Sequence, residues 1–186
     1  MDLQMVIAGL GGEGIIFMTR VLVEGLYRCG QPVISTETHG MAMRGGSVIS
    51  QIKIGDYQSP LIRYGEADLL VGTSLEEAHR NLPYLKEGGI IIKNTPQKGV
   101  HCIDASAIAH KIGNPRGGNL VLLGYVLAHL VPAISIEPFL EVTGELTPEK
   151  FLTGNLKALQ EGWQVVLQGN KEEDKAEEGN QAAREN

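Results

Sequence analysis

The chain has 186 residues, of which 42% are hydrophobic and 20% charged, and a formal net charge of −6 at pH 7. This length suits one α/β domain with a core on both sides of a sheet, rather than two domains. The acidic balance and the lack of a stripe of basic residues argue against a nucleic-acid-binding protein.

The beginning of the chain and its longest apolar stretch bear on localisation. Met1 and Asp2 lead directly into a strand pattern, without the basic segment of a signal peptide. Residues 119–136 are apolar but interrupted by Gly124, His129 and Pro132, which argues against a membrane span. We therefore expect a soluble, cytoplasmic protein that makes no membrane contact.

The first part of the chain predicts the opening of a doubly wound α/β fold. Residues 3–8 form a short apolar run that ends in glycines, which is typical of a buried parallel strand. Residues 15–29 carry apolar side chains at helical spacing and are followed by Gly30, a helix stop. Residues 32–36 predict a second strand, which completes a strand–helix–strand unit.

The pattern then changes, because residues 47–54 alternate apolar and polar side chains like a half-exposed strand. Residues 55–56 predict a turn and 59–62 an extended segment, so we expect an antiparallel excursion around residues 47–62. The other expected strands are 68–72, 90–94 and 100–104, and the other expected helices are 74–85, 105–111, 120–130, 135–143 and 148–168. Together they predict a three-layer α/β/α fold with a doubly wound, mostly parallel sheet.

Two local signals mark the expected helix 74–85. Ser74 and Glu77 have the spacing of a capping box, in which each side chain would bond to the backbone of the other residue. Gly88 and Gly89 are expected to close this helix.

The expected domain covers residues 1–168 and is followed by an acidic tail, residues 169–186. The tail has six acidic and three basic residues and no branched aliphatic residue. Such a segment cannot bury enough apolar surface to offset the entropy of ordering it. We expect it to be disordered or a frayed extension of the last helix.

The sharpest motif is GLGGEG, a G-x-G-x-x-G pattern between the first strand and the first helix. Its glycines permit a tight turn and let backbone N–H groups at a helix N-terminus approach an anion; they are Gly9, Gly11, Gly12 and Gly14. Glu37, 23 residues after Gly14, also fits the acidic residue that binds the ribose of a dinucleotide. One interpretation is therefore a free-standing, Rossmann-like dinucleotide-binding protein; the other is that the glycines only allow a close strand-to-helix crossing.

A second loop follows Glu37, where a Rossmann half would continue into its next helix. It contains His39, Gly40, Arg44, Gly45 and Gly46 and leads into the antiparallel-looking strand. An arginine beside paired glycines suits an anionic group or the backbone of a partner, although a loop charge is often only solvated. Residues 114–119 form another glycine-rich loop with an arginine and are compatible with a further anion or partner contact.

The spacing of the cysteines and histidines does not indicate a metal site or an iron–sulfur cluster. Cys29 and Cys102 are the two cysteines, and their spacing fits neither a metal motif nor a disulfide framework. An iron–sulfur cluster usually takes four thiolates, and the five histidines show no ligand spacing. We expect no metal site in this chain.

Six segments jointly resemble the gamma-type subunit of 2-oxoacid:ferredoxin oxidoreductases, the pyruvate/ketoisovalerate oxidoreductase gamma family. In order across about residues 3–168 they are VIAGLGGEGI, ETHGMAMRGGSVISQIKIG, SPLIRYGEADLLVG, LPYLKEGGIIIKNT, GNLVLLGYVLA and KFLTGNLKALQEGW. The HG-x-x-x-RGG and SPLI-x-x-G-x-ADLL forms look most similar to the beta subunit of indolepyruvate oxidoreductase.

The resemblance implies a complex of anaerobic metabolism that decarboxylates a 2-oxoacid on thiamine diphosphate, reduces ferredoxin through [4Fe–4S] clusters and releases an acyl-CoA. The partner subunits would hold thiamine diphosphate and the clusters, so this chain would bind no cofactor alone and be inactive alone. The two loops would face the shared site or the coenzyme A path, with Arg44 as the anion contact. The substrate would be indolepyruvate or another aryl pyruvate, while pyruvate, 2-oxoglutarate and branched-chain 2-oxoacids stay open. A non-enzymatic assembly protein that kept the fold is a third interpretation.

Overall fold

The computed structural model describes residues 2–40, 45–130 and 134–182, with side chains up to residue 168. The strands are β1 (Leu3–Leu10), β2 (Val33–His39), β3 (Ser47–Ile54), β4 (Ala67–Gly72), β5 (Leu85–Asn94) and β6 (Cys102–Ile103). The helices are α1 (Ile15–Arg28), α2 (Leu75–Arg80), the 3-10 helix η1 (Leu82–Tyr84), α3 (Ala105–Lys111), α4 (Gly118–Leu130), α5 (Glu137–Leu146) and α6 (Glu149–Ala182).

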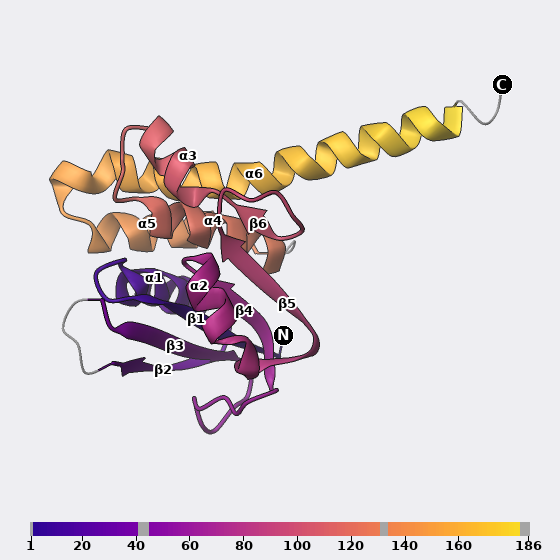
Figure 1. Ribbon diagram of the computed structural model, residues 1–186. Helices are drawn as coiled ribbons and strands as arrows, with labels where there is room; N and C mark the ends of the chain where they lie inside the picture. Colours follow the sequence, from indigo (N-terminus) through magenta and orange to yellow (C-terminus); the bar gives the residue numbers. More distant parts are fainter. Residues whose placement is uncertain (1, 41–44, 131–133, 183–186) are drawn as a thin grey trace.

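The strands form one sheet in the order β2-β3-β1-β4-β5-β6 (Figure 1). β3 lies antiparallel between β2 and β1, and β1, β4, β5 and β6 pair in parallel. The expected mostly parallel sheet with an antiparallel excursion is therefore confirmed, although β3 lies inside the sheet and separates β2 from β1. Residues 59–62 form no strand; instead the backbone N of Ile62 donates to Oε1 of Gln51 on β3 at 2.5 Å.

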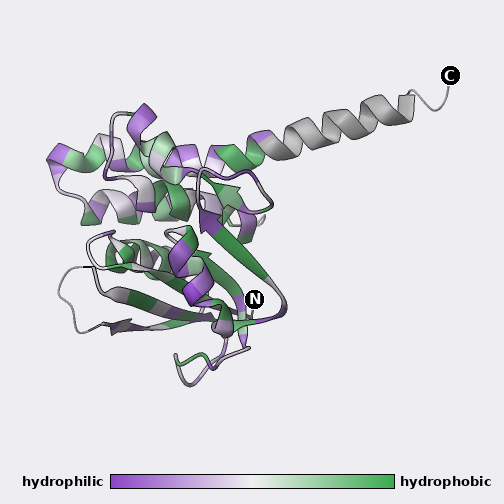
Figure 2. Ribbon diagram, in the orientation of Figure 1, coloured by the Kyte–Doolittle hydropathy of each residue, from purple (hydrophilic) through white to green (hydrophobic). Residues whose placement is uncertain are grey.

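The helices form two layers of unequal thickness on the two faces of the sheet. The main core joins one face, including Met5, Ile7 and Val71, to α1 and α3–α6. Figure 2 shows hydrophobic residues along the central strands and on the helices above them. The opposite face carries a smaller cluster around Val6 and Leu70 and is covered by α2 and the 57–66 segment. This arrangement confirms the expected α/β/α layers.

Helices α4 and α6 cross at glycines. A Cβ added at Gly124 would overlap the carbonyl oxygen of Leu159 and lie 2.8 Å from the backbone N of Trp163. A Cβ at Gly162 would overlap the carbonyl oxygen of Val121 in the same way. The two helix backbones are therefore in direct contact at this crossing.

The expected helix 74–85 is wrong in its second half. α2 ends at Arg80, and Pro83 lies in η1 before β5 begins at Leu85. Proline cannot supply the amide donor of a continuing α-helix and its ring clashes with the preceding turn. Gly88 and Gly89 lie inside β5, where Gly88 has φ +72°, so they do not close a helix.

The remaining differences concern the ends of elements. β6 contains two residues where a strand over 100–104 was expected, and α5 extends to Leu146. α6 continues to Ala182, into the acidic segment; the domain boundary at residue 168 stays a prediction. Within the described ranges, no helix is both long and apolar enough to cross a bilayer.

Candidate functional site

The glycine loop connects β1 to α1 in a conformation that requires glycine. Gly12 has φ +102°, and Gly14, the N-cap of α1, has φ +80°. Side chains are disfavoured in this left-handed region. A Cβ at Gly9 would overlap Oγ1 of Thr73 and lie 2.5 Å from Cδ1 of Ile15. Glycines are thus needed both for the turn and for the close approach to β4.

Glu13 fixes this loop to the neighbouring parallel strand. Its Oε2 accepts the backbone N–H of Leu10 at 2.8 Å and the hydroxyl of Thr73 at 2.5 Å. The backbone N of Thr73 in turn donates to the carbonyl of Ala8 at 2.9 Å. The Glu13 carboxylate and the backbone of Thr73 therefore tie the glycine loop to the end of β4.

The second loop meets the glycine loop through backbone hydrogen bonds. The N–H of Gly11 donates to the carbonyl of Gly46 at 2.8 Å, and the N–H of Gly45 donates to the carbonyl of Gly11 at 3.4 Å. The N–H of Gly40 donates to the carbonyl of Ser47 at 2.8 Å, which closes the base of the second loop. We call Gly11, Gly40, Gly45 and Gly46 the loop junction. The two groups of residues singled out in the sequence thus lie side by side.

A cavity of about 370 Å³ lies at this junction. Its lining residues are Leu10, Gly11, Gly12, Gly14, Ile15, Ile16, His39, Gly40, Gly46 and Val48. Ile16, in the first turn of α1, is 49% exposed beside it, and Nε2 of His39 lies 3.9 Å from Oε2 of Glu37. Arg44 lies outside the described residues.

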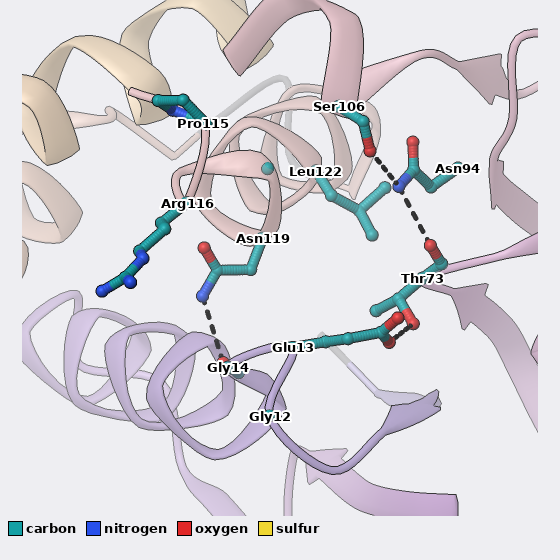
Figure 3. A pocket seen from close by; sticks show the side chains of 11 residues that line it. Gly12, Glu13, Gly14, Thr73, Asn94, Ser106, Pro115, Arg116, Asn119 and Leu122 are labelled. Atoms are coloured by element: carbon teal, nitrogen blue, oxygen red, sulfur yellow. Dashed lines mark hydrogen bonds between the residues drawn. The ribbon is translucent and has the colours of Figure 1, made fainter. Parts of the chain in front are cut away.

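A second cavity, of about 550 Å³, lies on the other side of the glycine loop (Figure 3). Its lining residues are Gly12, Glu13, Gly14, Thr73, Asn94, Ser106, Pro115, Arg116, Gly118, Asn119 and Leu122. Nδ2 of Asn119 donates to the carbonyl of Gly14 at 3.2 Å, and Nδ2 of Asn94 donates to the carbonyl of Thr73 at 2.9 Å. The loop at 114–119 therefore forms the wall opposite the glycine loop.

The charges around this cavity suit a polar ligand with an anionic group. Arg116 lines the cavity with its side chain extended towards α1 (Figure 3) and forms no ion pair within the part of the chain whose side chains are described. The first turn of α1 carries no acidic residue, and its N-cap, Gly14, has no side chain to bond the free amides. Helix N-termini with free amides favour negative charge. Glu13 supplies one carboxylate on the opposite side, which can accept from a ligand hydroxyl or amine.

Sequence reasoning missed Thr73, Asn94 and Ser106. Thr73 directly follows β4 and Asn94 ends β5, so both lie at carboxyl ends of parallel strands. Ligands of open α/β sheets bind at this edge. The strand ends were therefore the signal that could have found two of the three.

The geometry does not fit the dinucleotide interpretation. In a Rossmann half, the acidic residue ends the strand beside β1, where it can reach the ribose. Here β3 lies between β1 and β2, and Glu37 pairs with Ser50 of β3. Two strand spacings, about 9.5 Å, therefore separate the backbone of Glu37 from that of β1.

The described residues also offer no ligand set for a metal or cluster. No group of three or more His, Cys, Asp or Glu side chains is placed for metal binding among them. Cys29 follows α1 and Cys102 lies in β6, and burial raises the pKa of the Cys29 thiol. Two thiols do not fit a [4Fe–4S] cluster, which usually takes four.

Comparison with known proteins agrees with the fold and identifies the family of the chain. Residues 4–165 match the family described as pyruvate ferredoxin/flavodoxin oxidoreductase. Indolepyruvate oxidoreductase subunit IorB of Archaeoglobus fulgidus is 30% identical, over 91% of this chain and 98% of its own. The IorB subunit of Methanothermobacter thermautotrophicus is 28% identical, over 88% and 97% of the two chains.

Two solved structures are similar in fold. The gamma subunit of a keto/oxoacid ferredoxin oxidoreductase from Geobacter sulfurreducens has a TM-score of 0.71 at 24% identity, over 89% of this chain and 98% of that one. The 2-oxoglutarate:ferredoxin oxidoreductase of Magnetococcus marinus, solved with 2-oxoglutarate, coenzyme A and succinyl-CoA, has a TM-score of 0.74 at 24% identity, over 89% and 31%. The sequence match over nearly the whole chain confirms the resemblance seen in its motifs. The chain belongs to the pyruvate ferredoxin/flavodoxin oxidoreductase family, as a relative of subunits of 2-oxoacid:ferredoxin oxidoreductases.

Proposed function

We propose that this chain is the cluster-free subunit of a thiamine-diphosphate-dependent 2-oxoacid:ferredoxin oxidoreductase that acts on indolepyruvate or a related aryl pyruvate. The observation that carries the proposal is the similarity to IorB subunits over nearly the full length of both chains. Partner subunits would hold thiamine diphosphate and the [4Fe–4S] clusters, and ferredoxin would accept the electrons. The products would be the acyl-CoA and carbon dioxide.

Within that complex, the loop junction and its two cavities would face the shared site and the path of coenzyme A. Coenzyme A carries phosphates, and the free amides of α1 and the guanidinium of Arg116 favour anions. The hydrogen bonds of Glu13 and of the junction hold the glycine loop before α1 in place, which lowers the entropic cost of binding at the free amides. This chain would therefore bind and orient coenzyme A, while the partners carry the bond-breaking steps.

The test of the complex is an anaerobic affinity purification of the chain from its own cells, followed by mass spectrometry. We expect a brown complex that contains a larger, cluster-binding chain. A panel of indolepyruvate, phenylpyruvate, pyruvate, 2-oxoglutarate and 2-oxoisovalerate, with ferredoxin and coenzyme A, then identifies the substrate. A colourless, solitary protein that binds NAD would contradict the proposal.

The proposed contact between Arg44 and an anionic group of coenzyme A is tested by the Arg44→Ala variant of the complex. A charge-assisted hydrogen bond contributes about 1.5–3 kcal/mol, so the KM for coenzyme A should rise about tenfold or more. Arg20→Ala is the matched control, because Arg20 is an exposed arginine of α1 that pairs with Glu24 of the same helix. Unchanged coenzyme A affinity and turnover in Arg44→Ala would exclude this role.

A further inference from the structure

Glu77 is a buried carboxylate whose contacts lead to the second loop. It lies in the first turn of α2 and is 1% exposed. Its Oε2 accepts the hydroxyl of Ser47 at 2.9 Å, and its Oε1 lies 2.8 Å from Nη1 of Arg80. Burying a carboxylate with one cation beside it gives little net stability. The position of this acid therefore calls for a reason other than stability.

Ser47 links Glu77 to the loop junction. It is the first residue of β3, and its carbonyl accepts the N–H of Gly40 at 2.8 Å. The preceding carbonyl, that of Gly46, accepts the N–H of Gly11 at 2.8 Å. A displacement of Ser47 would therefore loosen both hydrogen bonds.

The contact also departs from the local rule for helix starts. Ser74 accepts the backbone N–H of Glu77 at 3.2 Å, which is half of a capping box. The other half would return the Glu77 carboxylate to the backbone of Ser74, but the carboxylate reaches across to β3 instead. The side chain thus gives up a local cap for a contact 30 residues away.

We propose that Glu77 is a positioning residue, which holds Ser47 and thereby the loop junction in place before a ligand or partner binds. The glycine loop has the parallel device, since Thr73 holds it through Glu13. Thr73 and Ser74 are adjacent, so the corner between β4 and α2 fixes both loops relative to one another. The expected effect on coenzyme A rests on the proposed function; the effect on the junction does not.

Two variants act on the contact, and a third is matched to them. Ser47→Ala removes the donor, and Glu77→Gln keeps the size of the side chain but removes the charge that strengthens the hydrogen bond from Ser47. Glu76→Gln is the control, because Glu76 is exposed and binds the same arginine, with Oε1 2.8 Å from Nη2 of Arg80, without reaching β3. A loss that came only from α2 would affect Glu77→Gln and Glu76→Gln and leave Ser47→Ala unchanged.

Hydrogen exchange of the full chain measures the junction directly. In Ser47→Ala and Glu77→Gln, the amides of Gly11 and Gly40 should exchange about tenfold faster, while that of Ile7 in the centre of the sheet changes less than about twofold. Glu76→Gln should exchange like the native chain. Unchanged exchange at the junction, or an equal increase at Ile7, would overturn the proposal.

Kinetics of the reconstituted complex separate this proposal from the proposed function. With a looser junction, the KM for coenzyme A should rise about fivefold and kcat change less than about twofold, since binding and not chemistry is affected. Faster exchange at the junction with an unchanged KM for coenzyme A would support the role of Glu77 and refute the coenzyme A contact.

Discussion

The crossing of α4 and α6 gives a sharp test of the packing, through Gly162→Ala. A Cβ at this position would overlap the carbonyl oxygen of Val121, lie 2.7 Å from its carbonyl carbon and 3.0 Å from the backbone N of Tyr125. These are backbone atoms of α4, which cannot turn away as the end of a side chain can. The helices must therefore separate.

Two effects of opposite sign determine how much Gly162→Ala changes the free energy of unfolding. Alanine is a better helix former than glycine by about 0.8–1 kcal/mol. Overpacking a close contact costs about 1–3 kcal/mol, and a gap of about 1 Å along the interface also weakens its dispersion contacts. Because the overlap is with backbone, we expect a net destabilisation of about 2 kcal/mol, or a fall in Tm of about 4–8 °C.

The matched control is Gly144→Ala in α5. A Cβ there would meet only Cδ1 of Leu152, at 3.7 Å, an ordinary contact. Because alanine favours the helix more than glycine does, Gly144→Ala should raise the free energy of unfolding by about 0.5 kcal/mol. Urea unfolding followed by far-ultraviolet circular dichroism compares the two variants with the native chain. A Gly162→Ala chain that unfolds at the same or a higher urea concentration than the native chain would refute the reasoning.

Two further predictions concern the glycine loop and the edge of the sheet. Gly9→Ala should cost about 1–3 kcal/mol in urea unfolding, because its Cβ would overlap Oγ1 of Thr73; native-like stability would contradict this close approach. The pKa of His101 is lowered below its ordinary value, mainly by burial and to a smaller extent by the nearby His129 and Lys93. As the pH falls, this imidazole is therefore protonated in the unfolded chain before it is protonated in the folded chain. The stability from the neutral imidazole is therefore complete above about pH 6.5 and declines as the pH falls through 6.5 towards the lower pKa of the folded chain. His101→Asn, which tolerates the native φ of +53°, should lose less stability than the native chain between about pH 7.5 and 5.5, and equal losses would exclude this effect.

The elements that the sequence predicted well are those set by local rules. The apolar run before Gly9 is β1, and the helical spacing from Ile15 is α1, which ends within one residue of the expected position. Buried parallel strands and amphipathic helices leave their period in the sequence because each residue's exposure follows from its place in the element. The glycine loop follows a different local rule, because its positive φ values at Gly12 and Gly14 favour glycine.

What the sequence could not predict depends on partners far along the chain. Glu37 has the spacing of a ribose-binding acid, but strand order decides whether it lies beside β1, and no local pattern records that β3 intervenes. The spacing of Ser74 and Glu77 predicted a reciprocal cap, but the Glu77 carboxylate accepts a hydrogen bond from the Ser47 hydroxyl instead. Arg116 and Asn94 line one cavity because the loop before α4 and the end of β5 both lie beside the glycine loop.

The place of β3 also affects how the sheet can assemble. β2 pairs with no strand other than β3 among the described residues, in a regular register from Val33–Ile54 to His39–Val48. Pairs so close in sequence have a low entropic cost of loop closure, and hairpins form within about 1–10 μs. β1 must pair with β3 across a much longer connection, between Leu10 and Ser47. The β2–β3 ladder can thus close first and enter the sheet as a preformed unit, and the residues that join its two strands include those that the proposed function assigns to coenzyme A.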